Sequence, residues 1–237
     1  MEMENSDLVS VIIPTYKRYQ LLLNAINSVK KQTYKNVEII VVIDGPTNYP
    51  ELPFGVKSIK LPENTREKFG YPCPGFCRTI GILHSKGKYV AFLDDDDEFF
   101  SNKLTLQIEA MKRTGTRMSC SEALIGNEAY DSSKTYEKFN LEKCYEYISS
   151  VFHRKGKMFN GFPELFELDF IQTNNSIITS TVVMERTLLD EIGYIGFLRY
   201  GSEIPEDYDC WIKALKFTKC VYVPEPLVYY YSHNRQH

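Results

Sequence analysis

The sequence predicts an α/β fold with a mostly parallel central sheet flanked by helices, and three observations lead to this prediction. The 237 residues are enough for one large domain with its own core, and no linker-like stretch divides them. Short apolar runs alternate along the first half of the chain with segments whose apolar residues recur at helical spacing. Polar side chains gather where these runs end, at the edge where open α/β sheets bind ligands.

Residues 8–97 contain a strand–helix alternation that predicts parallel pairing. The β-branched runs at 8–14 and Val37–Ile43 indicate buried strands, and a helix over 19–31 connects them. A strand, a helix and a second strand in this order form a parallel pair with a right-handed crossover. The elements predicted next are a short strand at 56–61, a loop at 62–74, a helix at 75–85 and a buried strand at 89–93.

The second half contains the same kinds of element and one segment that the patterns describe poorly. Residues 126–168 are polar at first, then basic and aromatic, and we interpret them as a variable excursion that holds a short helix. Pro205 is predicted to open a helix whose apolar residues follow at helical spacing. The other predicted elements are a helix at 102–113, strands at 116–125 and 174–183, a helix at 185–192, and two strands at 220–223 and 227–231 joined by Pro-Glu-Pro.

Four successive aspartates, at positions 94–97, follow the predicted strand at 89–93. Their carboxylates repel one another, and each would be costly to bury without a partner. A hard divalent cation such as Mg²⁺ or Mn²⁺ would balance them, because these ions prefer carboxylate and phosphate oxygens. The acids could instead form a solvated turn, with Asp97 or Ser101 capping the helix predicted from residue 102. Capping requires one or two acids rather than four, and from this stretch alone both interpretations stay open.

Two further candidates are ambiguous by position. Glu206 and Asp207 lie in the first turn of a predicted helix, where the helix dipole favours acids, and this structural role is the commoner one. A carboxylate there could act as a general base if the fold places it opposite the aspartates. His233 follows a tyrosine-rich strand, and it is either a solvated tail residue, which its position favours, or a ligand of a metal or phosphate.

Composition and charge exclude several classes of function. A net charge of −3 gives no general electrostatic reason to bind nucleic acid. The six cysteines lack the spacing of a disulfide framework or a zinc site, so we expect reduced thiols and a cytoplasmic location. The acidic N-terminus does not resemble a signal peptide, and no stretch approaches the ~20 apolar residues of a membrane span. Peripheral contact with a membrane stays open.

Four blocks of sequence then follow one another at ordinary spacing. They are Val-Ser-Val-Ile-Ile-Pro-Thr-Tyr-Lys-Arg at 9–18 with 28–33 and 37–45, Cys-Arg-Thr-Ile-Gly at 77–81 with Lys-Gly-Lys-Tyr at 86–89, Phe-Leu-Asp-Asp-Asp-Asp at 92–97, and Glu-Asp-Tyr-Asp-Cys-Trp at 206–211 with Tyr-Tyr-Ser-His at 230–233. By these blocks the chain resembles the inverting glycosyltransferases of family 2, which have the GT-A fold. The resemblance covers nearly the whole chain and is weakest over 126–168.

The resemblance implies that the first and second blocks bind a nucleotide. Thr15, Tyr16 and Arg18 would line the nucleotide pocket, and Asp44 would accept a hydrogen bond from the base. Arg78 would face the nucleotide or its diphosphate. Residues 1–115 would form the nucleotide-binding half of a single GT-A-like domain, and residues 116–237 the acceptor-binding half.

The third and fourth blocks would carry the chemistry. Asp94 and Asp95 would approach the ribose, whereas Asp96, with Asp94 near it, would bind Mn²⁺ or Mg²⁺. Asp207 would be the catalytic base, and His233 would contact the metal or the diphosphate. The implied reaction moves a sugar from a nucleotide sugar, expected to be UDP-linked, to a hydroxyl of a glycan, lipid-linked or other acceptor, with inversion at the anomeric carbon.

Three positions depart from the family pattern. Ile43-Asp44 lacks one carboxylate of the usual acidic pair, and Thr79 stands where Asn is usual. Asp95 occupies the variable position of the aspartate motif, so the identity of the metal ligands among the four aspartates stays open.

Two other functions compete with this interpretation. A nucleotidyltransferase that makes sugar nucleotides can share the α/β unit, but it normally has a Gly-rich loop after its first strand, and residues 14–18 contain no glycine. A catalytically inert nucleotide-binding module would be favoured by loss of Asp96 or Asp207, and both are present.

Overall fold

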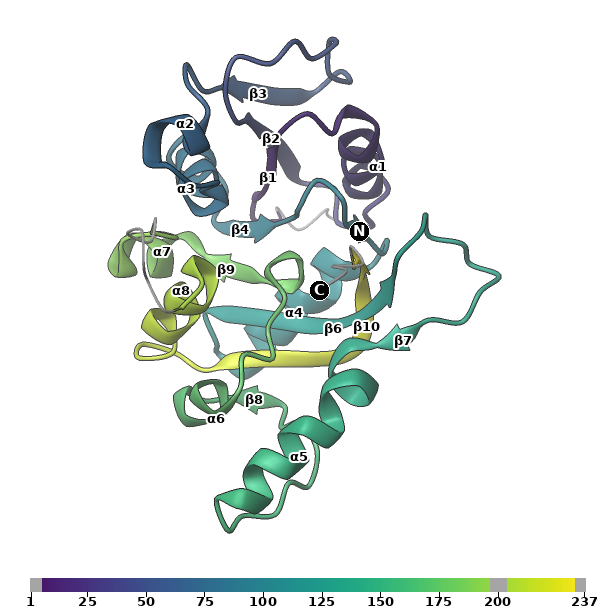
Figure 1. Cartoon of the computed structure of the whole chain (residues 1–237), viewed down its shortest axis with the longest axis vertical. Coiled ribbons are helices and arrows are strands. Elements are labelled where there is room, and N and C mark those ends of the chain that lie inside the picture. The colour runs from purple at the N-terminus through teal and green to yellow at the C-terminus, as the bar shows by residue number, and fades with distance from the viewer. Residues whose placement is uncertain (1–5, 197–203, 233–237) are drawn as a thin grey trace.

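The computed structural model describes residues 6–196 and 204–232, and one sheet of ten strands forms its centre (Figure 1). The strand order is β3-β2-β1-β4-β9-β6-β10-β5, with β7 beside β6 and β8 beside β10. The strands are β1 (Val9–Thr15), β2 (Val37–Ile43), β3 (Val56–Lys60), β4 (Tyr89–Phe92), β5 (Glu98–Phe99), β6 (Met118–Gly126), β7 (Glu137–Lys138), β8 (Leu165–Phe166), β9 (Val183–Glu185) and β10 (Cys220–Tyr231).

The predicted α/β class with a mostly parallel sheet is confirmed. Strands β3, β2, β1 and β4 are parallel neighbours, and β6 is parallel to β10. The antiparallel pairings, which include those of β9 with β4 and β6, span only two or three residue pairs each. All seven residues of β1 are buried, which is the pattern of a strand covered on both faces.

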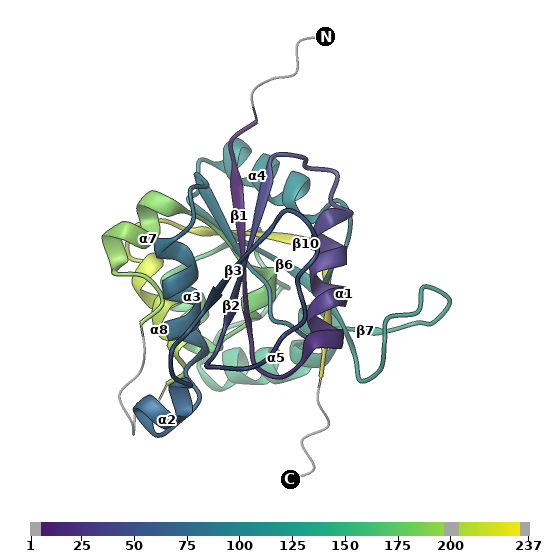
Figure 2. The same cartoon turned by 90° about the horizontal axis from the view of Figure 1, so that it is seen from above.

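Helices cover both faces of the sheet, and α1 and α3 lie on opposite faces of β1 and β2 (Figure 2). Successive residues of β1 alternate between the two cores: Ile12 packs on the α3 face, whereas Val11 and Ile13 pack on the α1 face. The helices are α1 (Tyr19–Lys30), α2 (Thr65–Phe69), α3 (Pro74–Leu83), α4 (Lys103–Thr114), α5 (Tyr145–Arg154), α6 (Leu168–Thr173), α7 (Arg186–Ile192) and α8 (Glu206–Ala214), with a π-helix η1 (Phe139–Cys144) and a 3₁₀ turn η2 (Thr179–Thr181).

The strand predicted at 174–183 is wrong. Only its last residue belongs to β9, and the 3₁₀ turn η2 precedes it. The run Ile-Ile-Thr-Ser-Thr-Val has the composition of a strand. The hydroxyls of Thr179 and Ser180, however, donate to carboxylates, and the backbone turns to bring them there.

Two other regions differ from prediction in smaller ways. The strands predicted at 220–223 and 227–231 form one strand, β10, because Pro-Glu-Pro shifts the register with β6 around Pro226 without ending the pairing. The loop predicted at 62–74 contains the short helix α2, which Asn64 caps by accepting a 3.0 Å hydrogen bond from the backbone N–H of Arg66. The short helix predicted within 126–168 is present as α5.

Among residues 6–196 and 204–232, no helix combines the length and the apolar character that crossing a membrane would require.

Gly81 allows α3 to lie close against β1. A Cβ atom at this position would lie 2.4 Å from Cγ2 of Ile12 and 3.2 Å from Cγ2 of Val42, both of which are fully buried. These are short, branched side chains inside a packed core, so they have little room to move away.

We therefore predict that Gly81→Ala destabilises the fold by about 1–3 kcal/mol, although alanine is the better helix former. Gly196→Ala is the control, because a Cβ at Gly196 would lie within 4 Å of no atom of the other residues that the structure describes. Urea unfolding of the two variants and the parent measures the difference. Equal stabilities would show that the close approach of α3 to β1 imposes no requirement for glycine.

Candidate active site

The carboxyl ends of β1 and β4 bring two polar loops together, as their parallel order requires. Thr15 ends β1, and its Oγ1 donates a 2.6 Å hydrogen bond to Oδ2 of Asp95 in the loop after β4. From the loop before α1, Nη1 of Arg18 lies 3.2 Å from Oδ1 of Asp95 and 2.5 Å from Oδ2 of Asp96. The Arg18 guanidinium therefore balances two of the four aspartates.

A second arginine, Arg78 on α3, lies between the loop after β4 and the first turn of α8. Its guanidinium donates to Asp94 through Nη2, and Nη1 lies 3.4 Å from Oε1 of Glu206. Burial disfavours a charged guanidinium here, but Asp94 and Glu206 outweigh this effect and raise the pKa of Arg78. Arg78 is 4% exposed, and its Nε has no hydrogen-bond partner among the described residues. Arg78 thus ties the start of α8 to the aspartates.

The turn η2 makes a second connection between the aspartates and α8. Oγ of Ser180 donates a 2.5 Å hydrogen bond to Oδ2 of Asp97 and accepts a 3.0 Å bond from the backbone N–H of Asp94. The preceding residue, Thr179, donates through Oγ1 to Oδ2 of Asp207 at 2.7 Å. Two consecutive hydroxyls therefore hold Asp207 and the aspartate loop in one site.

Asp97 is a buried structural residue and does not cap a helix. It is 1% exposed, and its Oδ1 accepts a 2.9 Å hydrogen bond from the backbone N–H of Tyr231 on β10. Helix α4 begins at Lys103 without a side-chain cap hydrogen bond from Asn102. The alternative in which Asp97 or Ser101 caps this helix is therefore wrong, because the carboxylate of Asp97 points into the sheet.

Acidic groups outnumber basic ones at this edge of the sheet. The cluster contains the four aspartates, Glu206 and Asp207, against the guanidiniums of Arg18 and Arg78. Burial raises the pKa of Asp95 to about 6, and burial together with the neighbouring aspartates raises the pKa of Asp97 well above its ordinary value. A ligand that carries positive charge would relieve this excess.

The carboxylates also have the chemistry of a magnesium or manganese site, with a limited set of ligands. Among the described residues, no three Asp, Glu, His or Cys side chains converge as a complete metal site. The side chains of Asp94 and Asp96 are 31% and 11% exposed, so both reach the surface of the cluster. One or two carboxylates together with substrate phosphates are the usual protein contribution to such a site, and this cluster fits that arrangement.

Asp44 and a neighbouring cavity lie beside Thr15. The backbone N–H of Asp44 donates to Thr15 at 2.9 Å, and its carboxylate accepts from the backbone N–H and the hydroxyl of Thr65, both at 2.7 Å. Tyr49 places its hydroxyl 2.9 Å from Oγ1 of Thr15. A cavity of about 410 Å³ opens here, and its lining residues are Lys17, Tyr19, Pro46, Thr47, Asn48 and Tyr49.

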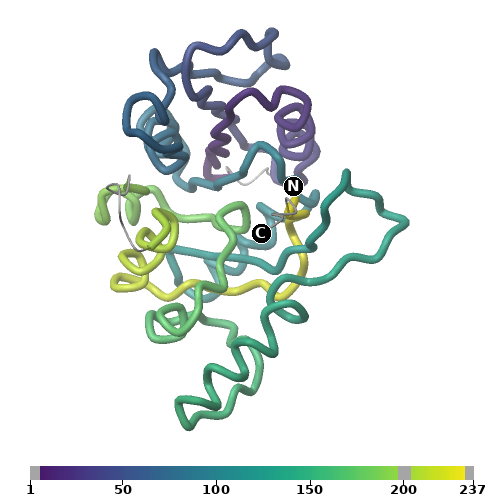
Figure 3. The backbone as a smooth tube through the Cα atoms, in the orientation of Figure 1, coloured from purple at the N-terminus to yellow at the C-terminus, as the bar shows by residue number. Residues whose placement is uncertain are grey.

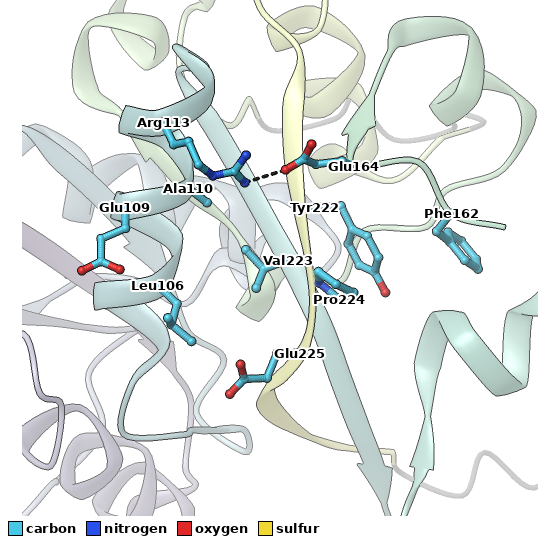
Figure 4. Close-up of a pocket in the computed structure, with 10 residues that line it drawn as sticks. All are labelled: Leu106, Glu109, Ala110, Arg113, Phe162, Glu164, Tyr222, Val223, Pro224 and Glu225. Atoms are coloured by element: carbon cyan, nitrogen blue, oxygen red, sulfur yellow. Dashed lines mark hydrogen bonds and ion pairs between the residues drawn. The ribbon is translucent and has the colours of Figure 1, made fainter.

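A larger cavity, of about 660 Å³, lies between α4 and β10 and contains none of the acids described above (Figure 4). Arg113 on α4 and Glu164 face each other across it and form an ion pair of 2.5 Å. Its size alone does not make it the reactive site, because its acids, Glu109, Glu164 and Glu225, are not those at the ends of β1 and β4, and its arginine, Arg113, is exposed.

The structure brings together most of the residues that the sequence singled out. The residues from the loops after β1 and β4, from α3 and from α8 meet in one cluster. Tyr16, which follows β1, is 42% exposed. His233 lies outside the described residues. Sequence reasoning missed Thr179, Ser180 and Tyr49 as parts of the site. Three consecutive hydroxyl residues inside an apolar run, at Thr179–Thr181, are the signal that could have found the first two.

A buried polar network behind η2 holds the turn in place. Nε2 of Gln107 on α4 donates to the carbonyl oxygen of Thr181 at 2.8 Å and to Oγ of Ser119 at 3.0 Å. Nζ of Lys103, one turn earlier, contacts Oε1 of Gln107 at 2.5 Å and lies 4.3 Å from the ring centre of Phe99. Lys103 is fully buried, and this burial lowers its pKa to about 7.

The architecture matches solved structures of the GT-A class. TarS residues 1–349 from S. aureus, in complex with UDP-GlcNAc, superposes with a TM-score of 0.65 at 18% identity, covering 97% of this chain and 59% of that one. The mannosyltransferase PcManGT from Pyrobaculum calidifontis, in complex with GDP-Man and Mn²⁺, also gives a TM-score of 0.65, at 12% identity, covering 98% of this chain and 59% of that one. At these identities the likeness establishes the fold, and it confirms the GT-A type.

The chain belongs to glycosyltransferase family 2, because the sequence model of Glycosyl transferase family 2 matches residues 10–68 and 74–182. An uncharacterized glycosyltransferase of Rickettsia felis is 36% identical over 205 residues, which are 86% of this chain and 29% of that protein. The Escherichia coli protein WfgD, a UDP-Glc:alpha-D-GlcNAc-diphosphoundecaprenol beta-1,3-glucosyltransferase, is 30% identical over 212 residues, 88% of this chain and 70% of that one. The chain spans less than a third of the R. felis relative's length.

The lowered pKa of the buried Lys103 predicts how the stability of the protein depends on pH. The pKa of Lys103 is about 7 in the folded protein and about 10.5 in an unfolded chain, so the unfolded chain binds more protons between these values. The free energy of unfolding should therefore rise with pH above neutrality, by up to about 1.4 kcal/mol per pH unit, and Lys103→Met should lack this increase.

Urea unfolding of both proteins, from neutral pH upward, measures this effect as a difference in which other titrating groups cancel. If the free energy of unfolding changes with pH in the same way for the parent and Lys103→Met, the pKa of Lys103 is not lowered in the folded protein.

Proposed function

We propose that this chain is a metal-dependent, inverting glycosyltransferase that moves a sugar from a UDP-linked donor to a hydroxyl of an acceptor. The acceptor is a glycan, a lipid-linked sugar or another hydroxyl compound. One observation carries the proposal: Thr179 and Ser180 hold Asp207 and the aspartate loop at one edge of the sheet. A base and a charge-balancing centre on opposite sides of one donor are what inverting transfer requires.

The nucleotide half comprises residues 1–115 in this proposal. Thr15, Tyr16, Arg18 and Asp44 lie at or just after the carboxyl ends of β1 and β2. The 410 Å³ cavity that would take the base is lined by the residues next to them in sequence, and Tyr49 in its wall contacts Thr15. Arg18 supplies a guanidinium that can pair with a diphosphate. WfgD is a glucosyltransferase that uses UDP-Glc, and TarS is solved in complex with UDP-GlcNAc; both relationships support a UDP-linked donor.

Asp96 and Asp94 are the proposed ligands of Mn²⁺ or Mg²⁺, together with oxygens of the donor diphosphate, and the Mn²⁺ in the PcManGT complex supports this choice. When bound, the ion neutralises the negative charge that develops on the departing nucleoside diphosphate. Arg78 keeps Asp94 in place by pairing with it and with Glu206. His233, in the same proposal, contacts the metal or the diphosphate.

Asp207 is the proposed general base. Thr179 donates to its Oδ2 and the backbone N–H of Tyr208 donates to its Oδ1, each at 2.7 Å, so both oxygens are held in orientation. The carboxylate takes the proton from the acceptor hydroxyl while the hydroxyl oxygen attacks the anomeric carbon on the face opposite the leaving diphosphate. The configuration at that carbon is inverted. Residues 116–237 would supply the acceptor side.

For the base, we predict that Asp207→Asn lowers kcat by about 10²-fold or more and leaves the affinity for UDP nearly unchanged. The amide keeps the shape of the side chain and cannot accept the proton. Asp209→Asn is the control, because Asp209 lies on the same helix but pairs with Lys213 at 2.6 Å. Initial rates of sugar transfer and calorimetric titration of UDP give the two readouts, and an equal loss of both would reject Asp207 as the base.

For the metal, we predict that Asp96→Ala removes the increase in UDP affinity that Mn²⁺ produces. Titrations with Mn²⁺ and with a chelator separate this increment from the contribution of the protein alone. Asp131→Ala, in the exposed connection before β7, is the control that removes the same charge elsewhere. An unchanged Mn²⁺ increment in Asp96→Ala would exclude this carboxylate from the metal site. Hydrolysis of UDP-sugars with Mn²⁺ and no acceptor further distinguishes an active enzyme from an inert nucleotide-binding module.

A further inference from the structure

Helix α5 and the turn that follows it project from the body of the molecule, at the bottom of the view in Figure 3. We refer to residues 153–158, His-Arg-Lys-Gly-Lys-Met, as the basic tip. All six residues are exposed, and Met158 is 84% exposed. Tyr147, earlier on α5, is 57% exposed. The projection therefore ends in positive charge with one exposed apolar side chain, that of Met158, in the same turn.

The charge of the basic tip is opposite to that of the whole chain. The chain has a net charge of −3, yet the tip contains three lysine and arginine residues and no acid. No ion pair involves these three cations among the described residues; Nζ of Lys155 only contacts the hydroxyl of Thr173, at 3.2 Å. The cavity that Lys155 and Lys157 line also contains two acids: Glu167 is paired with Lys219 at 2.5 Å, and Asp169 forms no ion pair among the described residues.

The basic tip is presented by a firmly packed support. Ile148 and Val151 bury the inner face of α5, and the ring of Phe159, just after the tip, lies 5.3 Å from that of Phe152. Gly156 ends the helix with φ at 68°, and the backbone N–H of Lys157 donates to the carbonyl oxygen of Phe152 at 3.0 Å. This turn directs the apolar Phe159 inward and leaves Met158 outside the core.

We infer that the basic tip is a contact surface for an anionic lipid bilayer. Lysine and arginine side chains near a membrane are attracted by acidic headgroups, and an exposed Met beside them can enter the headgroup region. Three cations and one apolar side chain produce a weak, reversible contact, which is a peripheral one. The inference does not depend on the proposed catalytic roles, because the residues that carry it belong to a different part of the chain.

The test is sedimentation of the whole chain with vesicles of two compositions, phosphatidylcholine alone and phosphatidylcholine mixed with phosphatidylglycerol. We expect binding to the anionic vesicles at low salt, with loss at high salt and on the neutral vesicles. Replacing the three cations with serine (Arg154→Ser, Lys155→Ser, Lys157→Ser) should weaken this binding by about ten- to a hundredfold. Met158→Ser should weaken it less and leave its salt dependence unchanged.

The matched control replaces three exposed lysines elsewhere, Lys60→Ser, Lys86→Ser and Lys216→Ser, and so makes the same change in net charge. It should bind anionic vesicles as the parent does. The conservative exchange Arg154→Lys, Lys155→Arg and Lys157→Arg should also retain binding, which separates loss of charge from misfolding. Equal loss in the tip variant and the control, or no binding by the parent, would overturn the inference. Tighter binding of a polyglutamate peptide than of anionic vesicles would assign the basic tip to an acidic protein and overturn it as well.

Discussion

Four carboxylates pair with two guanidiniums where the central strands end, and Asp97 and Asp207 are hydrogen-bonded beside them; the surrounding structure makes this packing tolerable. Taking acids out of water is costly, and the raised pKa of Asp95 and of Asp97 reflects that cost. Hydrogen bonds from Thr15, Ser180 and the backbone of Tyr231 offset it. Each of these donors comes from a different strand or turn, so the acidic edge depends on the whole sheet being correctly assembled.

The need to hydrogen-bond these buried carboxylates explains why residues 179–181 form the turn η2 and not a strand. A run with the composition of a strand gives up strand pairing, and its hydroxyls bond instead to Asp207 and Asp97. Behind the turn, Gln107 and Lys103 hold the carbonyl of Thr181 from α4. Local preference for a strand is therefore overridden, because unsatisfied buried carboxylates would cost more than the lost strand hydrogen bonds.

The net charge of −3 is small, but two regions of the molecule carry local charge of opposite sign. Acids are concentrated at the edge of the sheet, where we propose that the donor binds. Three exposed cations that form no ion pair with any described residue lie together at the basic tip of α5. A diphosphate with its cation suits the first region, and an anionic surface suits the second. In our two proposals, one chain binds two kinds of partner through opposite electrostatics at separate places.

Several parts of the fold and the site followed from residue patterns alone. The buried strands β1, β2 and β4 and the helices between them were predictable, because apolar runs and helical spacing are local properties of a chain. The meeting of Thr15, Arg18 and the aspartates was also predictable, since parallel neighbouring strands end at one edge. Gly81 could be recognised in the family block, although its reason, the contact with Ile12, is visible only in three dimensions.

What the sequence determined by itself was the α/β class, the acidic edge and the family resemblance, because each depends on the order and spacing of residues along the chain. Only the tertiary structure decided that η2 links Asp207 to the aspartate loop, that Arg78 is buried between Asp94 and Glu206, and that residues 179–181 form a turn. These outcomes depend on hydrogen bonds between residues 16 to 128 positions apart. Burial and charge balance at one point in space select such contacts, and local sequence patterns contain no record of them.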